Sequence, residues 1–241
     1  MELSPYHKII PERLELLEKI QALLKNKTTI HFTQKYAKRK LQLISYVINP
    51  HIKETIMITA GCHGNEPAPV YALYNFLSKK TKIKNKRIVI VPCIVPYGFC
   101  LNVDVNVNGV NINRDFFSKN PQKETIVLKK LVKKYQPTFV LDMHEDPDEE
   151  KFFLYFQGKN FRKKAEEIVR LISKEIKIYH KKKIHKDEVI DGIIENGKKG
   201  TSFDDYLPIL GIASFCTETP GLYPFRKRIK AYENILKFIC Q

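Results

Sequence analysis

A histidine and a glutamate three residues apart, His63 and Glu66, could bind one metal ion. Residues 61–66 read Gly-Cys-His-Gly-Asn-Glu and lie between an apolar run, 55–60, and an apolar segment, 67–77. These flanking patterns predict a buried strand and a buried helix. In open α/β sheets, ligands bind at the edge where such strands end. An imidazole and a carboxylate at short spacing, with a further histidine elsewhere, are typical of a catalytic zinc site whose fourth position is left to water.

Two further predicted strands end in groups of the same kind. His144 follows a strand predicted at 137–143, and Glu218 follows one predicted at 212–217. One such residue is usually a surface or capping group. Several that converge on one sheet edge favour a functional site.

Apolar periodicity predicts the elements that would position these residues. The predicted helices are 11–25, 67–77, 123–135, 161–173, 202–210 and 227–240. The predicted strands are 41–48, 55–60, 87–91, 137–143, 152–157 and 212–217. Residues 97–113 are predicted to form a long polar loop, and residues 174–200 a basic surface segment that could act as a lid. Strands that alternate with helices predict an α/β fold of three layers, a mixed β-sheet flanked by helices, in a single domain over 1–241.

The composition excludes a disordered chain, and the charge raises the question of a polyanionic partner. The 241 residues are 43% hydrophobic and carry a formal net charge of +16. Such a charge can indicate nucleic acid or another polyanion as a partner. The lysines come in short runs without interleaved aromatic residues, so we interpret them as solvated helix faces. Nucleic acid is therefore not the expected partner.

The N-terminal residues, the lack of a long apolar run and the cysteines predict a cytoplasmic protein. The first residues lack the apolar region of a signal peptide, and no stretch approaches the ~20 apolar residues of a membrane span. The five cysteines are odd in number, scattered, and contain no C-x-x-C pair. This usage is typical of free thiols in a reducing compartment. We expect no membrane association.

Four segments together resemble the zinc carboxypeptidase superfamily, which includes the metallocarboxypeptidases and the succinylglutamate desuccinylase/aspartoacylase branch. They are residues 61–66, 108–116 (Asn-Gly-Val-Asn-Ile-Asn-Arg-Asp-Phe), 142–144 (Asp-Met-His) and 215–218 (Phe-Cys-Thr-Glu). The resemblance spans residues 54–221. The first motif, with Pro-Ala-Pro-Val after it, is more similar to the acylase branch. The second motif and the preceding Pro-Tyr-Gly at 96–98 are more similar to the peptidase branch, including compact murein-peptide amidases.

The resemblance implies roles for six residues. His63, Glu66 and His144 would bind one Zn²⁺ per chain, which lowers the pKa of water toward ~7 and polarises a carbonyl. Glu218 would be the general base. Asn113 and Arg114 would grip a substrate carboxylate, because guanidinium offers a bidentate fork. A simpler interpretation of Arg114 is an ion pair with Asp115 or with another acidic residue.

Several positions depart from the usual pattern of the superfamily. Asp104 stands where peptidase relatives usually carry an arginine that stabilises the oxyanion, and Asn111 stands where an aspartate usually orients the first zinc histidine. The expected substrate-capping tyrosine falls near Asn196, so Tyr206 or Tyr223 would have to replace it.

Three further positions lie close to these motifs. One of them, Asp142, has two interpretations, and the other two, Asp204 and Phe203, concern the substrate pocket. Asp142 either orients His144 or is a structural acid that accepts backbone amides. Asp204 falls where relatives carry an acid on the pocket-forming segment. Its neighbour Phe203 could floor that pocket and favour an apolar substrate side chain.

Three functions follow from these residues. The first is a zinc carboxypeptidase or amidase that acts on a small peptide with a free carboxylate. The second is an N-acyl-amino-acid deacylase with the same zinc chemistry. The third, least favoured, is a polyanion- or nucleic-acid-binding protein on a weakened enzyme scaffold.

Overall fold

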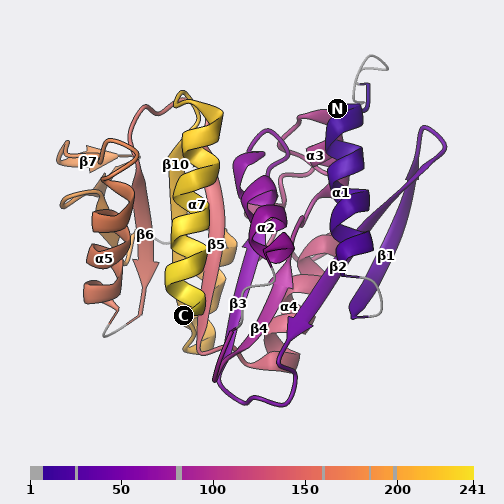
Figure 1. The fold of residues 1–241 in the computed structure, drawn as a ribbon, viewed down its shortest axis with the longest axis horizontal. Coiled ribbons are helices and arrows are strands. Elements are labelled where there is room, and N and C mark those ends of the chain that lie inside the picture. The colour runs from indigo at the N-terminus through magenta and orange to yellow at the C-terminus, as the bar shows by residue number, and fades with distance from the viewer. Residues whose placement is uncertain (1–7, 25–26, 80–82, 159–160, 185, 198–199) are drawn as a thin grey trace.

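The computed structural model describes residues 8–24, 27–79, 83–158, 161–184, 186–197 and 200–241. Eight strands form one mixed sheet in the order β1-β2-β4-β3-β5-β10-β6-β9, and β7 pairs with β8 in a small separate ribbon (Figure 1). The strands are β1 (Thr28–Tyr36), β2 (Arg39–Ile48), β3 (Thr55–Ala60), β4 (Arg87–Val91), β5 (Phe139–Asp146), β6 (Phe153–Gln157), β7 (Lys183–Ile184), β8 (Asp187–Glu188), β9 (Ile193–Glu195) and β10 (Ala213–Pro220).

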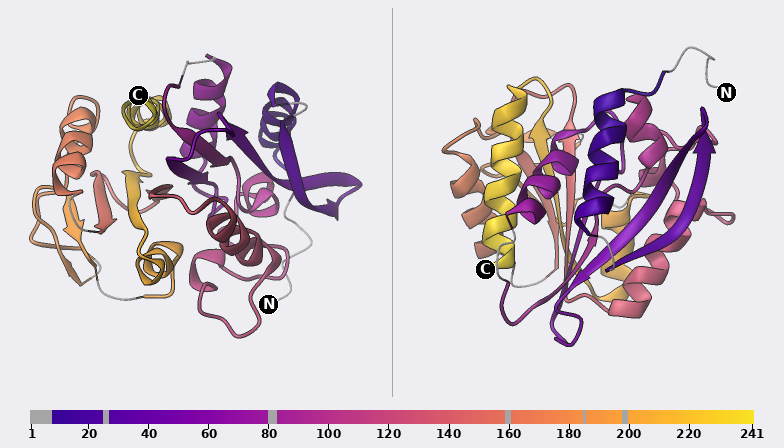
Figure 2. Two further views of the ribbon diagram at one scale, coloured as in Figure 1. Left: turned by 90° about the horizontal axis from the view of Figure 1, so that it is seen from below. Right: turned by 45° about the vertical axis from the view of Figure 1, so that its right-hand side comes forward.

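Helices cover both faces of this sheet, which confirms the predicted three-layer α/β fold (Figures 1 and 2). They are α1 (Pro11–Leu23), α2 (Ala68–Ser78), α3 (Pro96–Leu101), α4 (Lys123–Tyr135), α5 (Arg162–Ile172), α6 (Phe203–Tyr206) and α7 (Phe225–Cys240), with the 3₁₀ turns η1 (Ile112–Arg114) and η2 (Leu207–Leu210). Apolar side chains of α1, α2, α5 and α7 share one core with one face of the sheet. Those of α4 and α6 share a second core with the other face. The single-domain assignment over 1–241 stays a prediction.

The centre of the sheet is parallel, and this brings the chemically important strand ends together. β4, β3, β5 and β10 run parallel to one another, whereas β2 and β6 flank them in the antiparallel sense. Every residue of β3 is buried, as expected for a strand covered on both faces. The carboxyl ends of parallel strands meet at one edge, so the segments after β3, β5 and β10 lie close together.

The strand order reverses at β3. The chain passes from β3 to β4 on one side and then crosses to β5 on the other side. The connecting helices α2 and α4 therefore lie on opposite faces of the sheet (Figure 2). A crevice forms at the carboxyl ends of strands around such a switch point, and ligands bind there.

The elements differ from those predicted in three places. Residues 97–113 are not one loop, because α3 forms at Pro96–Leu101 and all its residues are buried. The sequence does not predict β1, whose residues are half-buried or exposed and mostly polar; it forms by pairing with β2 at the sheet edge. Within 174–200, β9 joins the main sheet beside β6, so part of this segment belongs to the fold.

The cysteines agree with the expected thiol chemistry. All five are buried and free. In the described part of the chain we find no helix with the length and apolarity needed to cross a bilayer.

Candidate metal centre and active site

The turn after β3 has a shape that requires glycine. A Cβ on Gly64 would lie 1.9 Å from the backbone carbon of Gly98 in α3. Gly61 adopts a φ of 64°, which other residues rarely adopt. Arg13 of α1 donates from Nη1 to the carbonyl oxygens of Gly64, at 2.6 Å, and Phe99, at 2.9 Å. Helices α1 and α3 thus brace the turn that carries His63 and Glu66.

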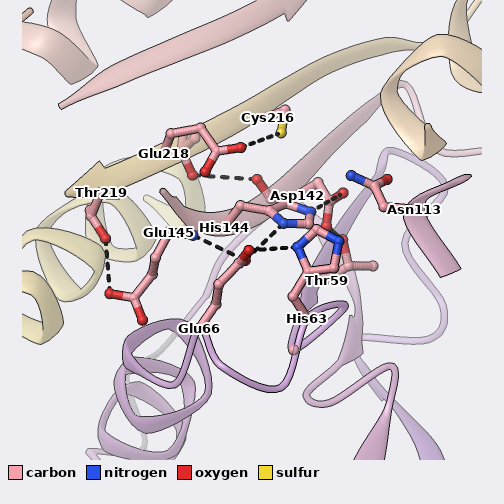
Figure 3. A network of polar contacts seen from close by, with 12 residues as sticks. Thr59, His63, Glu66, Asn113, Asp142, His144, Glu145, Cys216, Glu218 and Thr219 are labelled. Atoms are coloured by element: carbon pink, nitrogen blue, oxygen red, sulfur yellow. Dashed lines mark hydrogen bonds and ion pairs between the residues drawn. The ribbon is translucent and has the colours of Figure 1, made fainter. Parts of the chain in front are cut away.

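Glu66 lies between the two histidines and contacts the same ring atom of each. Its Oε1 is 2.5 Å from Nδ1 of His63, and its Oε2 is 2.9 Å from Nδ1 of His144 (Figure 3). The ligating atoms of the three residues all lie within 4.8 Å of one another. The structure therefore brings together the three side chains predicted as metal ligands, although they come from two separate segments.

The opposite nitrogen of each ring meets an oxygen acceptor. Nε2 of His63 lies 3.1 Å from Oδ1 of Asn111, and Nε2 of His144 lies 3.1 Å from Oδ2 of Asp142. The other oxygen of Asp142 accepts a 2.5 Å hydrogen bond from the Thr59 hydroxyl. Acceptors at both Nε2 atoms favour the tautomer whose Nδ1 lone pair is free for a metal ion. The carboxylate of Asp142 thus contacts the side chains of His144 and Thr59. This geometry supports the interpretation in which Asp142 orients His144.

The ionisable groups of the site shift one another's pKa values. Burial would raise the pKa of Glu66, but His63 and His144 outweigh it and lower that pKa to about 2. Burial would lower the pKa of His144, but Asp142 and Glu66 raise it well above its usual range. Two imidazole nitrogens and one carboxylate are a donor set that suits zinc. The residues present therefore fit the metal that the resemblance implies.

Glu218 lies beside this group on the neighbouring strand. It occupies the position of β10 that pairs with His144 of β5, and its Oε1 is 3.7 Å from the thiol of Cys216. Burial raises the pKa of Glu218 well above its usual range, and the negative charge of Glu66 adds to this effect. His63, Glu66 and Glu218 all line one cavity of about 510 Å³.

Asn113 and Arg114 line the same cavity. Oδ1 of Asn113, which is buried, accepts a 3.1 Å hydrogen bond from the backbone N–H of Phe203. The exposed Arg114 donates from Nη1 to the carbonyl oxygen of Asn113 at 3.1 Å. Asp115 instead accepts hydrogen bonds from Thr125 and the backbone of Gln122 at the start of α4. Among the described residues no ion pair joins Arg114 to Asp115, so the guanidinium remains available to a ligand.

Comparison with known proteins places this arrangement in a family. The model of the succinylglutamate desuccinylase/aspartoacylase catalytic domain matches residues 52–235. The chain belongs to this family. No curated protein matches the chain. Membership in the desuccinylase/aspartoacylase family supports an amide hydrolase, and the family is typically metal-dependent.

Solved structures share the fold of this desuccinylase/aspartoacylase-family chain. A candidate metallopeptidase from Shewanella amazonensis is 24% identical, with a TM-score of 0.78 over 94% of this chain and 90% of that one. A metallo-carboxypeptidase from Pseudomonas aeruginosa is 12% identical, with a TM-score of 0.68 over 95% of this chain and 68% of that one. A murein-tripeptide amidase from Escherichia coli O157 is 20% identical, with a TM-score of 0.62 over 89% and 93%. At these identities the likeness shows the carboxypeptidase-like fold alone.

Of the positions that depart from the usual pattern, Asp104 and Asn196 lie outside the described cavity wall, whereas Asn111 contacts His63. Asp104 is exposed and lies outside the described cavity wall. Tyr206 packs against Phe116, and neither Tyr206 nor Tyr223 lines the cavity. The tyrosine that does line it is Tyr155 of β6.

Sequence reasoning missed the face of β6 that borders the cavity. Phe153, Tyr155 and Gln157 alternate along the strand and all line the cavity. Their period of two could have predicted a shared face. The strand next to β10 would then have been recognised as a wall of the site.

Asp204 lines the cavity, whereas Phe203 does not. Phe203 is buried in the core and stacks on Phe116 with the ring centroids 4.8 Å apart, so the prediction that it floors the specificity pocket is wrong. Asp204 accepts a 2.5 Å hydrogen bond from the Ser214 hydroxyl. Burial raises its pKa to about 6, and Asp205 and Asp142 add to this effect. The pocket wall is thus polar rather than apolar at this point.

Proposed function

We propose that this chain is a zinc-dependent hydrolase that cleaves an amide bond in a small substrate bearing a free carboxylate. The observation that carries the proposal is the placement of His63, Glu66, Glu218 and Arg114 on one cavity, with His144 beside Glu66. His63, Glu66 and His144 would hold the ion. Zinc, when bound, supplies a Lewis acid that polarises a carbonyl and lowers the pKa of water.

The chain's own residues would perform the proton transfers and the positioning. Glu218 accepts the proton of the attacking water and gives it to the leaving amine nitrogen. Glu218 lines the cavity together with His63 and Glu66, so its carboxylate borders the space in which that water would be held. Asn113 and Arg114 would bind the substrate carboxylate and so set the distance from the clamp to the scissile bond.

A carboxypeptidase or amidase is the first candidate for the specific reaction. Arg114 is the sole arginine or lysine among the described residues of the cavity wall, which also contains Asp204, Asp205 and Asp187. Arg114 would bind one carboxylate of the substrate, and the acidic side chains of the wall would accept hydrogen bonds from donors elsewhere on the substrate. The Pseudomonas aeruginosa metallo-carboxypeptidase was solved with (2-guanidinoethylmercapto)succinic acid, which has both kinds of group.

An N-acyl-amino-acid deacylase is the second candidate. The observation that favours it is the match to the desuccinylase/aspartoacylase family over residues 52–235. In this reaction the clamped carboxylate belongs to the acylated amino acid. The zinc chemistry and the role of Glu218 stay the same.

One experiment tests the proposal and separates the candidates. Zinc-loaded protein is incubated with N-acetylated dipeptides and with N-acyl amino acids, and the released amine is measured. Release of a C-terminal residue from peptides supports the first candidate, and release of free acid from N-acyl amino acids supports the second. Glu218→Gln should keep the metal and lose roughly 10²–10⁴-fold in kcat. No release from any compound by the zinc-loaded protein would contradict the proposal.

The polyanion-binding alternative has its own test. We propose no nucleic-acid partner despite the net charge of +16. Salt-dependent retention of DNA or RNA by metal-stripped protein, together with no hydrolysis by the zinc form, would reverse this choice.

A further inference from the structure

A second hollow of about 460 Å³ continues from the cavity of the candidate active site. The two share the wall residues Gln157, Gly197, Gly200 and Asp205. Beyond this shared neck, the described residues that line the second hollow are Phe117, Asn196, Pro208 and Ile209. The neck therefore carries the polar side chains of Gln157 and Asp205, whereas the far part combines three apolar side chains with the amide of Asn196.

The second hollow lies on the side of the carboxylate clamp. The bond from Phe203 N–H to Asn113 ties the clamp to the start of α6. From there α6 carries Asp205 to the neck, and η2 carries Pro208 and Ile209 to the far part. The clamp segment itself continues from Arg114 to Phe117, whose ring lies 6.2 Å from that of Tyr206. The segment that carries the clamp and the segment tied to it thus both contribute to the wall of the hollow.

The side chains of the neck and the far part differ in chemistry. Asp205 is held in place because its Oδ2 accepts hydrogen bonds from the backbone N–H of Ser202, at 2.9 Å, and from the Ser202 hydroxyl, at 2.5 Å. With the Gln157 amide it offers acceptors to a group that carries an N–H. Phe117 is 47% exposed and Ile209 is 66% exposed. Their exposed apolar surface is therefore accessible to an apolar group of a ligand in this hollow.

We propose, on the basis of the proposed function, that the residue whose carboxylate is clamped has a long side chain that enters this second hollow. The side chain passes Gln157 and Asp205 with an N–H group and ends in an apolar group on Phe117, Pro208 and Ile209. The chemical class that fits is a lysine-like side chain acylated on its terminal nitrogen. A short residue such as alanine leaves the hollow unfilled.

The test compares three residues X at the clamped position: alanine, lysine and Nε-butanoyl-lysine. Each is presented as Nα-acetyl-X and as acetyl-alanyl-X, and kcat/KM is measured for release of X. We expect a preference of roughly tenfold or more for Nε-butanoyl-lysine over alanine. Ile209→Ser should reduce that ratio several-fold. Ile30→Ser, the same substitution at an exposed isoleucine of β1, should leave it unchanged. Equal kcat/KM for the three residues, or an equal effect of both substitutions, would overturn the proposal.

A binding measurement keeps this test separate from the proposed function. Free Nε-butanoyl-lysine and free alanine are titrated by calorimetry into the zinc-loaded wild type, Ile209→Ser and Ile30→Ser. The second-hollow proposal is supported if Nε-butanoyl-lysine binds more tightly than alanine and if Ile209→Ser, but not Ile30→Ser, weakens that binding. This holds even if no substrate is hydrolysed and the proposed function fails. Hydrolysis without any preference in rate or binding overturns the second hollow and leaves the proposed function standing.

Discussion

His144 and Glu218 occupy paired positions on the adjacent parallel strands β5 and β10. The hydroxyl of Tyr232, on α7, contacts the carbonyl oxygen of His144 and lies 3.2 Å from that of Thr217. The candidate ligand and the candidate base are therefore fixed relative to each other by the sheet and by one buried tyrosine. A rigid backbone under both groups suits a reaction in which a proton moves over a short distance.

Asp142→Asn should weaken zinc binding while leaving the fold intact. Asparagine can still accept the bond from Nε2 of His144, but it lacks the charge that makes the imidazole a better ligand. We expect zinc affinity to fall roughly 10- to 100-fold, measured by competition with a chromophoric chelator. Asp148→Asn, at an exposed acid beyond β5, is the control. Equal affinities of Asp142→Asn and wild type would mean that Asp142 does not act on the metal site.

Arg114→Ala should impair hydrolysis of substrates with a free carboxylate. A hydrogen bond to a charged group contributes about 1.5–3 kcal/mol, so we expect kcat/KM to fall roughly 10- to 150-fold. Matched substrates that end in a carboxamide should be affected much less. The control is Arg39→Ala, which removes an exposed arginine from β2. An unchanged kcat/KM on every carboxylate substrate would show that Arg114 is not the clamp.

Much of this fold could be predicted, because its central strands have unambiguous sequences. Residues 55–60 and 87–91 are largely apolar, and both form strands in the buried parallel centre of the sheet. β1 could not be predicted, since its polar residues become a strand only by pairing with β2. α3 was missed because Gly98 weakens a helical pattern, and because this short helix depends on its burial against neighbouring elements.

More of the metal site than of the substrate pocket could be predicted from the sequence. Three parallel strands bring His63, His144 and Glu218 to one edge of the sheet. The parallel direction of these strands could be predicted because strands and helices alternate along the sequence. The choice between Phe203 and Asp204 as a pocket wall depends on how α6 is rotated against the core. That rotation is determined by the stacking of Phe203 on Phe116 and by the bond from Phe203 N–H to Asn113. Neither contact between distant segments can be inferred from local sequence.

Asp204→Asn should stabilise the protein at neutral pH more than at acid pH. Burial raises the pKa of Asp204 from an ordinary 3.8 to about 6, so the folded protein holds this proton more tightly than the unfolded chain. Its stabilising contribution is present below pH 3.8 and is lost as the pH rises to about 6. The shift corresponds to about 3 kcal/mol at most.

The measurement is urea unfolding of wild type and Asp204→Asn between pH 4 and 7, with a chelator present. Asparagine retains an oxygen that can accept the bond from Ser214. The difference in unfolding free energy between the two proteins should therefore grow with pH in favour of the variant. If this difference in unfolding free energy stayed constant over the pH range, ionisation of Asp204 would not destabilise the folded protein.

The metal content of the purified protein tests the central claim most directly. Wild type and His144→Ala are equilibrated with zinc, dialysed, checked for folding by circular dichroism, and analysed by mass spectrometry for metal per chain. His180→Ala, which changes a largely exposed histidine, is the matched control. The geometry predicts one zinc per chain in wild type and His180→Ala, and far less in His144→Ala. A wild-type content well below one that added zinc does not restore, or equal contents in all three proteins, would contradict a zinc site at His63, Glu66 and His144.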